Sequence, residues 1–96
     1  SLGVLMSPDS AGHFAQPLNR YRGGMWVSSV RDESPAQRQG LQRGDVLVGL
    51  HVWETISTDN VIHILNRPEL KQLLPLKFYV VRTGRTLYGY LPLESD

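Results

Sequence analysis

The sequence lacks cysteine, long hydrophobic runs and any excess of charge of one sign. Without cysteine, disulfide bridges and thiolate metal sites are excluded. The longest apolar stretches are about six residues, far below the roughly 20 that a membrane-spanning helix needs, so we expect no membrane contact from this domain. Ten basic and nine acidic residues give a formal net charge of +1, which provides no general attraction to nucleic acid or anionic lipid.

The chain of 96 residues has the length of one domain, and we expect a single domain over residues 1–96. A chain of this size buries roughly 60–65% of its unfolded surface, which is enough to fold without disulfides. Its start has neither the basic flank nor the apolar run of a signal peptide. The sequence also begins and ends abruptly, so we expect a fragment of a larger protein, with any targeting signal outside it.

Short apolar runs separated by glycine, proline and polar residues predict a β-rich domain. We expect strands at residues 2–6, 25–30 and 46–50, a short strand within 51–56, and strands at 76–83 and 86–91. The last two would form a hairpin closed by Gly84 and Arg85. Residues 7–24, with two prolines and three glycines, predict a long loop.

Capping signals predict two helices. Ser34 is suited to the N-cap of a short helix that has Pro35 at its first position and Gly40 after its end. A longer helix would begin at Ser57 or Thr58 and end before Pro68, and residues 68–74 would add one more helical turn. The expected fold class is α+β: a small, partly open antiparallel β-barrel or sandwich of five to six strands, capped by two helices.

Residues 34–47, SPAQRQGLQRGDVL, form the most specific motif of the chain. The segment resembles S-P-A-x-x-x-G-L-x-x-G-D-x-(I/L/V) of the PDZ domains of bacterial HtrA-type serine proteases. Each residue also has a structural role, with Leu41 in the core, Gly44 in a turn and Asp45 hydrogen-bonding that turn. The motif therefore indicates a PDZ-like fold and does not itself predict a binding site.

Leu2, Gly3 and Val4 resemble the x-Φ-G-Φ loop of PDZ domains, where Φ is an apolar residue. In the family this loop binds a terminal carboxylate through outward-pointing backbone amides rather than through a basic side chain. The resemblance implies that the amides of these three residues bind the end of a peptide. By the two-residue period of a strand, Leu2, Val4 and Met6 would share the face that lines the pocket for the last side chain.

In PDZ domains the peptide groove lies between the longer helix and this strand, here along Leu5 and Met6. Residues at i, i+4 and i+7 of the helix lie on one stripe, which gives Thr58, Ile62 and Leu65 as groove residues. One common PDZ group has histidine at the first of these positions and selects a hydroxyl two residues before the peptide end. The presence of Thr58 puts that preference in doubt for this chain.

Val61 and Ile64 are expected to face the core. The alternative for the helix is that all four of its apolar residues, including Ile62 and Leu65, are core residues.

The resemblance implies a non-catalytic module that binds C-terminal or extended peptide segments by strand addition and prefers an apolar last residue. In HtrA-type proteins such a module recognises substrates for, or regulates, an attached trypsin-like protease domain. Bacterial members of the family work mainly in the periplasm or cell envelope, which is the expected location. The alternative function is a scaffold PDZ domain that docks onto a neighbouring domain of its own protein or onto a partner protein, without a protease.

Other functions find less support in the sequence. None of the serines lies in a Gly-x-Ser-x-Gly elbow, and the three histidines, His13, His51 and His63, have neither triad nor zinc-ligand arrangement, so we expect no catalytic residue, metal ion or cofactor. Residues 20–24 and Trp26 are too small a basic and aromatic segment to predict nucleic-acid binding. Trp53 and Glu54, at an expected bend, are a candidate protein contact or a partly buried tryptophan.

Overall fold

The structure is a computed structural model, and it describes residues 3–9 and 23–92. The strands are Val4–Pro8 (β1), Met25–Val30 (β2), Val46–Leu50 (β3), Trp53–Glu54 (β4), Leu76–Arg82 (β5) and Arg85–Leu91 (β6). The helices are Pro35–Arg38 (α1), Thr58–Leu65 (α2) and a 3₁₀ helix, Pro68–Leu73 (η1). The order of elements follows the sequence-based prediction, and β2 and β3 have the predicted bounds.

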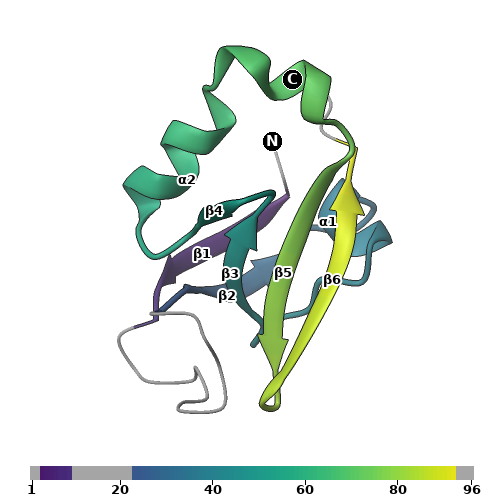
Figure 1. Cartoon of the computed structure of the whole chain (residues 1–96). Helices are drawn as coiled ribbons and strands as arrows, with labels where there is room; N and C mark the ends of the chain where they lie inside the picture. The colour runs from purple at the N-terminus through teal and green to yellow at the C-terminus, as the bar shows by residue number, and fades with distance from the viewer. Residues whose placement is uncertain (1–2, 10–22, 93–96) are drawn as a thin grey trace.

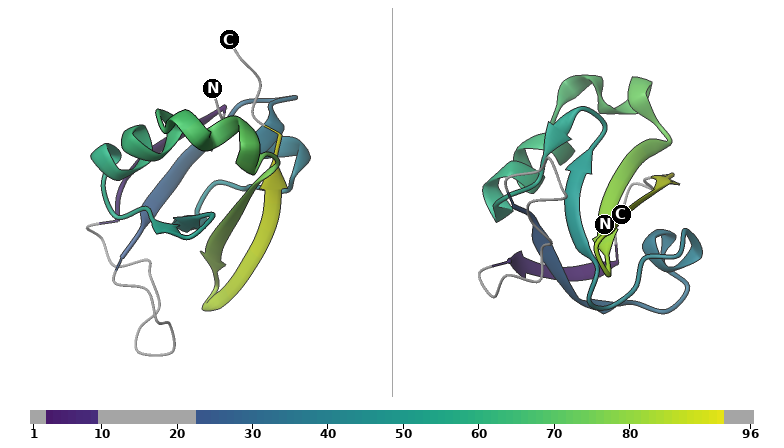
Figure 2. Two further views of the ribbon diagram at one scale, coloured as in Figure 1. Left: turned by 45° about the horizontal axis from the view of Figure 1, so that its top comes forward. Right: turned by 60° about the horizontal axis from the view of Figure 1, so that its bottom comes forward.

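The six strands form one antiparallel sheet in the order β1-β2-β3-β5-β6, with β4 paired to β3 off this path (Figure 1). The sheet is open, so β1 and β6 are its two edge strands. Figure 2 shows α2 running alongside β1, whereas α1 lies at the end of the molecule near β6. The predicted α+β class with six strands and two capping helices is confirmed, in the form of an open sheet rather than a closed barrel.

The main core fills the space between the sheet and the two α-helices. It combines Met25, Leu47, Leu50, Leu76, Phe78, Val80 and Leu91 of the sheet with Ala36 and Leu41 of the α1 segment and Val61 and Ile64 of α2. The opposite face of the sheet has a smaller buried cluster of Val46, Val48 and Val81. Both faces of β3 are therefore buried, which explains its uninterrupted apolar sequence.

Both α-helices begin at the predicted caps. The Ser34 side chain accepts a hydrogen bond from the Gln37 backbone N–H and caps α1. At α2, Ser57 and Asn60 form a capping box, in which each side chain accepts a hydrogen bond from the other's backbone N–H. Gly40 follows α1 with a φ of 88°, the left-handed conformation that favours glycine after a helix end.

Asp45, which is buried, joins residues 34–47 to β5 through an ion pair with the half-buried Arg82. Its carboxylate accepts hydrogen bonds from Arg82 Nε and Nη2 at 2.7 and 2.8 Å, and from the Gln42 backbone N–H at 2.9 Å. Arg82 Nη2 also donates to the carbonyl of Gly40 at 2.8 Å. The hydrogen bond with Asp45 raises the pKa of Arg82 above its ordinary value.

Two predicted boundaries are wrong. β1 continues through Ser7 to Pro8, beyond the predicted end at residue 6, because these residues pair with Trp26 and Met25 of β2. The final hairpin turns at Thr83 and Gly84, one residue earlier than predicted, and both residues have positive φ, as a two-residue hairpin turn requires. Leu2 and residues 10–22 of the predicted loop lie outside the described residues.

Candidate functional site

The hydrogen bonds of β1 determine which of its amides face the open edge of the sheet. Arg31 N–H donates to the Gly3 carbonyl at 2.6 Å, and Asp9 N–H donates to the Gly24 carbonyl at 3.0 Å. Because residues of an antiparallel strand alternate in the direction of their backbone groups, the odd-numbered residues face β2. Val4 and Met6 therefore direct their N–H and C=O groups to the edge that no described strand covers.

The same edge ends at Pro8. Proline has no N–H, so the row of donors along β1 stops after Met6. Proline on an edge strand also limits uncontrolled pairing with other strands. Within β1, two backbone N–H groups, those of Val4 and Met6, therefore point to the open edge. This number of donors is suited to pairing with a short peptide rather than with a long strand.

Gly3, at the start of β1, has a φ of 82° and turns the chain into the strand. It lies against Ser34, the N-cap of α1, so closely that a Cβ on Gly3 would overlap the Ser34 side chain. The sequence indicated a structural role for Ser34 but not this contact. Ser34 thus packs against Gly3 of the predicted carboxylate loop. Leu2, the first residue predicted for that loop, lies outside the described residues.

α2 contacts β1 and forms the second wall of the candidate groove. Val61 and Ile64 are buried in the core, as predicted. Ile62 is 52% exposed, so the alternative that every apolar residue of α2 belongs to the core is wrong. Thr58 is exposed and Leu65 is half-buried against the main core.

The β1 side of the candidate groove comes from Val4 and Met6. Both are half-buried and pack against the main core, the same cluster that Leu65 contacts. Val4, Met6 and Leu65 therefore pack on the same apolar cluster. Their contact with a peptide remains a prediction.

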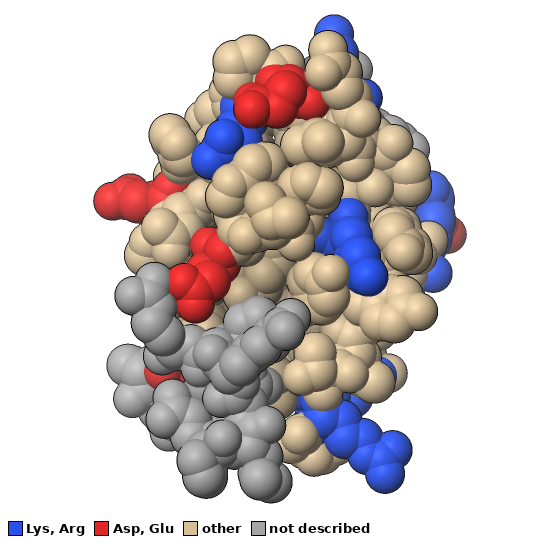
Figure 3. Space-filling view, in the orientation of Figure 1, with Lys and Arg blue, Asp and Glu red and all other residues tan. Residues whose placement is uncertain are grey.

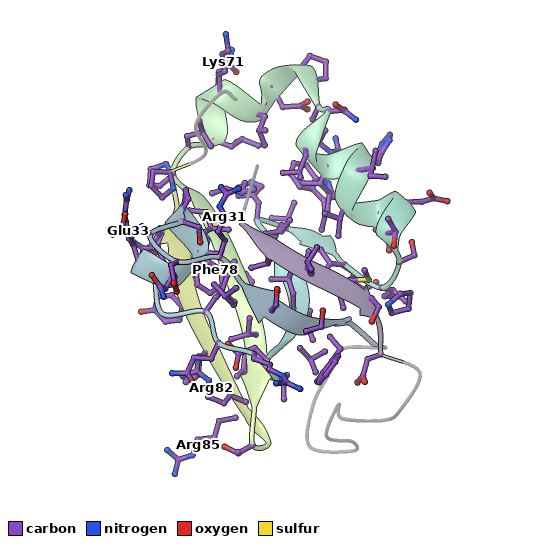
Figure 4. The ribbon with its side chains drawn as sticks, turned by 180° about the vertical axis from the view of Figure 1, so that it is seen from behind. Arg31, Glu33, Lys71, Phe78, Arg82 and Arg85 are labelled. Atoms are coloured by element: carbon purple, nitrogen blue, oxygen red, sulfur yellow. The ribbon has the colours of Figure 1, made fainter. Side chains whose placement is uncertain are left out.

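Leu5 points to the other face of β1 and is 66% exposed. It borders a pocket of about 310 Å³ together with Gly3, Val4, Ser29 and Arg31. Figure 4 shows Arg31 beside the start of β1. The sequence predicted no role for Ser29 or Arg31, because only strand pairing, which places them opposite Leu5 and Gly3, reveals their position.

The described residues contain no group of three or more His, Cys, Asp or Glu side chains arranged to hold a metal ion. Within the same residues, the helices are all too short or too polar to cross a membrane. On the face shown in Figure 3, Lys and Arg side chains are distributed among uncharged surface rather than gathered in one basic patch.

No protein-family model matches the sequence, and neither does any curated protein. Among solved structures, the HtrA3 PDZ domain bound to the phage-derived ligand FGRWV is similar, with a TM-score of 0.71 and 22% identity. That match covers 96% of this chain and 82% of the HtrA3 chain.

Two structures of the HtrA-type protease AlgW with a decapeptide, one of them of a variant, are also similar. Their TM-scores are 0.68 and 0.67, with 24% and 23% identity. They match 99% and 100% of this chain but only 29% and 30% of the AlgW chains. The chain therefore has the fold of the PDZ domains of HtrA-type proteases.

Proposed function

We propose that this chain is a peptide-binding PDZ module that captures the C-terminal ends of polypeptides by adding them as a strand to β1. The observation that carries the proposal is the open edge of β1, where Val4 and Met6 direct their backbone N–H groups toward the side on which α2 lies. An extended peptide running antiparallel to β1 completes this row of hydrogen bonds. The fold shared with PDZ domains that were solved with peptides supports the same function.

The amides of Leu2, Gly3 and Val4 bind the terminal carboxylate. The positive φ of Gly3 produces the turn that directs successive amides to one side, so that an anion is held without a basic side chain. The Ser34 contact fixes the position of that turn. Since these hydrogen bonds join the backbone of the domain to the backbone of the peptide, their contribution to the affinity is independent of the peptide sequence.

Specificity comes from the apolar surface beside the amides. Val4 and Met6 of β1, with Ile62 and Leu65 of α2, receive the last side chain of the peptide and favour an apolar residue there. Thr58, at the first groove position of α2, has no imidazole to select a hydroxyl. Leu5 contacts the alternate side chains of the peptide, which point to the opposite face of the extended sheet.

The module serves as the substrate-recognition or regulatory domain of an HtrA-type serine protease in the periplasm or cell envelope. The support for this context is the fold, which the HtrA-type protease AlgW contains over less than a third of its chain. The second candidate is a scaffold domain that docks onto a neighbouring domain or a partner. The open edge of β1 supports this function too, because an internal extended segment can pair with it without a free C-terminus.

The test compares one decapeptide ending in valine with its C-terminal amide by isothermal titration calorimetry, while amide shifts of Val4 and Met6 report the site. The free acid is expected to bind at least about tenfold more tightly, a difference of about 1.4 kcal/mol. A third peptide with a free carboxylate but aspartate as its last residue controls for charge alone and is expected to bind weakly. Equal affinity of acid and amide overturns capture of a chain end and leaves the scaffold function.

A further inference from the structure

We propose that the domain has a second binding site, for a carboxylate, in the pocket between β4 and the face of α2 that lies away from the peptide groove. This pocket has a volume of about 230 Å³. It is lined by Trp53, Glu54, Ile56, Asn60, His63, Ile64 and Arg67. The function proposed above uses none of these residues.

The pocket contains an arginine with one buried donor, Nε, that lacks a partner among the described residues. Arg67 lies over the Trp53 ring, with its guanidinium carbon 3.8 Å from the ring centroid. Its Nε is buried and has no hydrogen-bond partner among the described residues, although the side chain as a whole is 26% exposed. Glu69 Oε2 forms an ion pair with Nη1 at 3.7 Å, which is too long for a hydrogen bond.

The geometry of this arginine favours a planar, singly charged anion. A guanidinium stacked on an aromatic ring is held in one plane and offers its N–H groups edge-on, as a fork that matches the two oxygens of a carboxylate. Nε belongs to that edge and is buried in the free domain, so a carboxylate supplies the missing partner only when the guanidinium shifts toward the pocket. Glu54, which lines the same pocket and has an interaction of its own, repels a dianion such as phosphate more strongly than a singly charged carboxylate.

The rest of the pocket suits a ligand in which the carboxylate is attached to a small apolar group. Ile56, Ile64 and the Trp53 ring provide apolar walls. Asn60 uses its side-chain oxygen to accept from the N–H groups of Ile56 and Ser57, which leaves its amide NH₂ as a further donor. The volume is below the roughly 300–1,000 Å³ of pockets for drug-sized ligands, so the ligand is a small organic acid or one acidic side chain of a partner.

The pocket is separate from the peptide groove because α2 lies between them. Ile62 and Leu65 belong to the stripe assigned to the groove, whereas Asn60, His63 and Ile64 line the pocket. Residues 100° apart on a helix are on different faces, so the two sites share the helix but no side chain. Binding at one site therefore can be measured while the other is occupied.

The experiment is a titration with benzoate, followed by NMR of the Arg67 Nε–H and Trp53 indole N–H signals. We expect both signals to move with benzoate, whereas benzamide, the neutral analogue, leaves them in place. Movement with both compounds, or with neither, overturns the proposal.

Two substitutions of Arg67 distinguish the contribution of its planar, two-pronged guanidinium from that of its positive charge. Arg67→Gln is expected to weaken benzoate binding at least tenfold, monitored at the Trp53 indole. Arg67→Lys keeps the charge but loses the planar fork, and is expected to weaken binding by a similar factor. Arg85→Gln, in an exposed residue of β6, is the matched control and is expected to change nothing. Unchanged affinity of the Arg67→Gln variant overturns the proposal, and the peptide affinity of both variants shows whether they are folded.

A blocked peptide, acetylated and amidated, with one glutamate between apolar residues distinguishes the source of the carboxylate. It offers a side-chain carboxylate and no chain end. Binding at least tenfold tighter than benzoate assigns the site to an acidic side chain of a partner. Weaker binding than benzoate assigns it to a small organic acid.

Discussion

Gly3 and Ser34 lie in direct contact, with no room between them for a side chain on Gly3. One is the glycine of the predicted carboxylate loop and the other caps α1 through its bond with Gln37. Thirty-one positions separate these residues in the chain. The SPA motif therefore has a second structural role in this domain, because Ser34 packs against the turn whose amides are proposed to bind the peptide.

Gly3→Ala is expected to displace this turn and to weaken peptide binding at least about tenfold, or 1.4 kcal/mol. The substitution forces alanine into the left-handed conformation, which costs about 1–2 kcal/mol. Its Cβ also overlaps the Ser34 side chain, which caps α1 and has little freedom to move away. Calorimetry and urea unfolding measure the two effects. Gly40→Ala is the control, because its φ of 88° is similar and a Cβ there meets nothing within 4 Å. Equal loss of peptide affinity in both variants would contradict the role of the contact.

Asp45→Ala is expected to lower the free energy of unfolding by about 2–3 kcal/mol. Asp45 is 1% exposed and accepts three hydrogen bonds, and its loss leaves Arg82 and the Gln42 N–H without their partner. The estimate stays below that for a fully buried pair because Arg82 is 31% exposed. Urea unfolding with an unchanged m-value checks it, and Asp32→Ala, which removes an exposed bond to Gln37, is expected to cost less than about 0.5 kcal/mol.

Local sequence signals predicted most of the fold. The apolar runs of β2 and β3 and the caps at Ser34 and Ser57 each specify an element through contacts within a few residues. The helical period, which is also a local property, correctly predicted that Val61 is buried and Ile62 is exposed. These features depend on local geometry, which a sequence records directly.

Features that depend on contacts between distant residues were missed. The extension of β1 to Pro8 is produced by pairing with β2, against the low strand propensity of proline. Thr83 adopts a positive φ because strand pairing places it in a two-residue turn. Arg67, between α2 and η1, lies on Trp53 of β4 through a tertiary contact that no spacing in the sequence indicates. In each case tertiary structure determines the conformation.

The pKa of Lys77 is expected to lie above its ordinary value of 10.5 and to fall toward it in Tyr79→Phe. Hydrogen bonding of the ammonium group to the Tyr79 side chain is expected to be the main cause, and the negative charges of the ionised forms of Tyr79, Tyr90 and Tyr88 are expected to add to it. Because the folded pKa is higher than the unfolded one, the stabilisation is complete below pH 10.5 and is lost as the pH rises through the folded value. NMR titration of the Lys77 side chain measures the shift.

Tyr90→Phe is the control for this titration, because Tyr90 contributes only through its charge. Its effect on the pKa of Lys77 is expected to be smaller than that of Tyr79→Phe. A larger effect would show that charge, rather than the hydrogen bond, dominates.

Ile62→Arg is expected to abolish detectable peptide binding while changing the free energy of unfolding by less than about 0.5 kcal/mol. Ile62 is 52% exposed on α2, so the arginine reaches solvent and costs little in the free domain, but it occupies the space of the last peptide side chain. Ile64→Arg is the matched control: the same change at a buried position is expected to unfold the domain. Circular dichroism and peptide calorimetry on both variants give the result. If the Ile62→Arg variant stays folded and binds the peptide with wild-type affinity, Ile62 does not border the groove, and the peptide must lie elsewhere on the edge of β1.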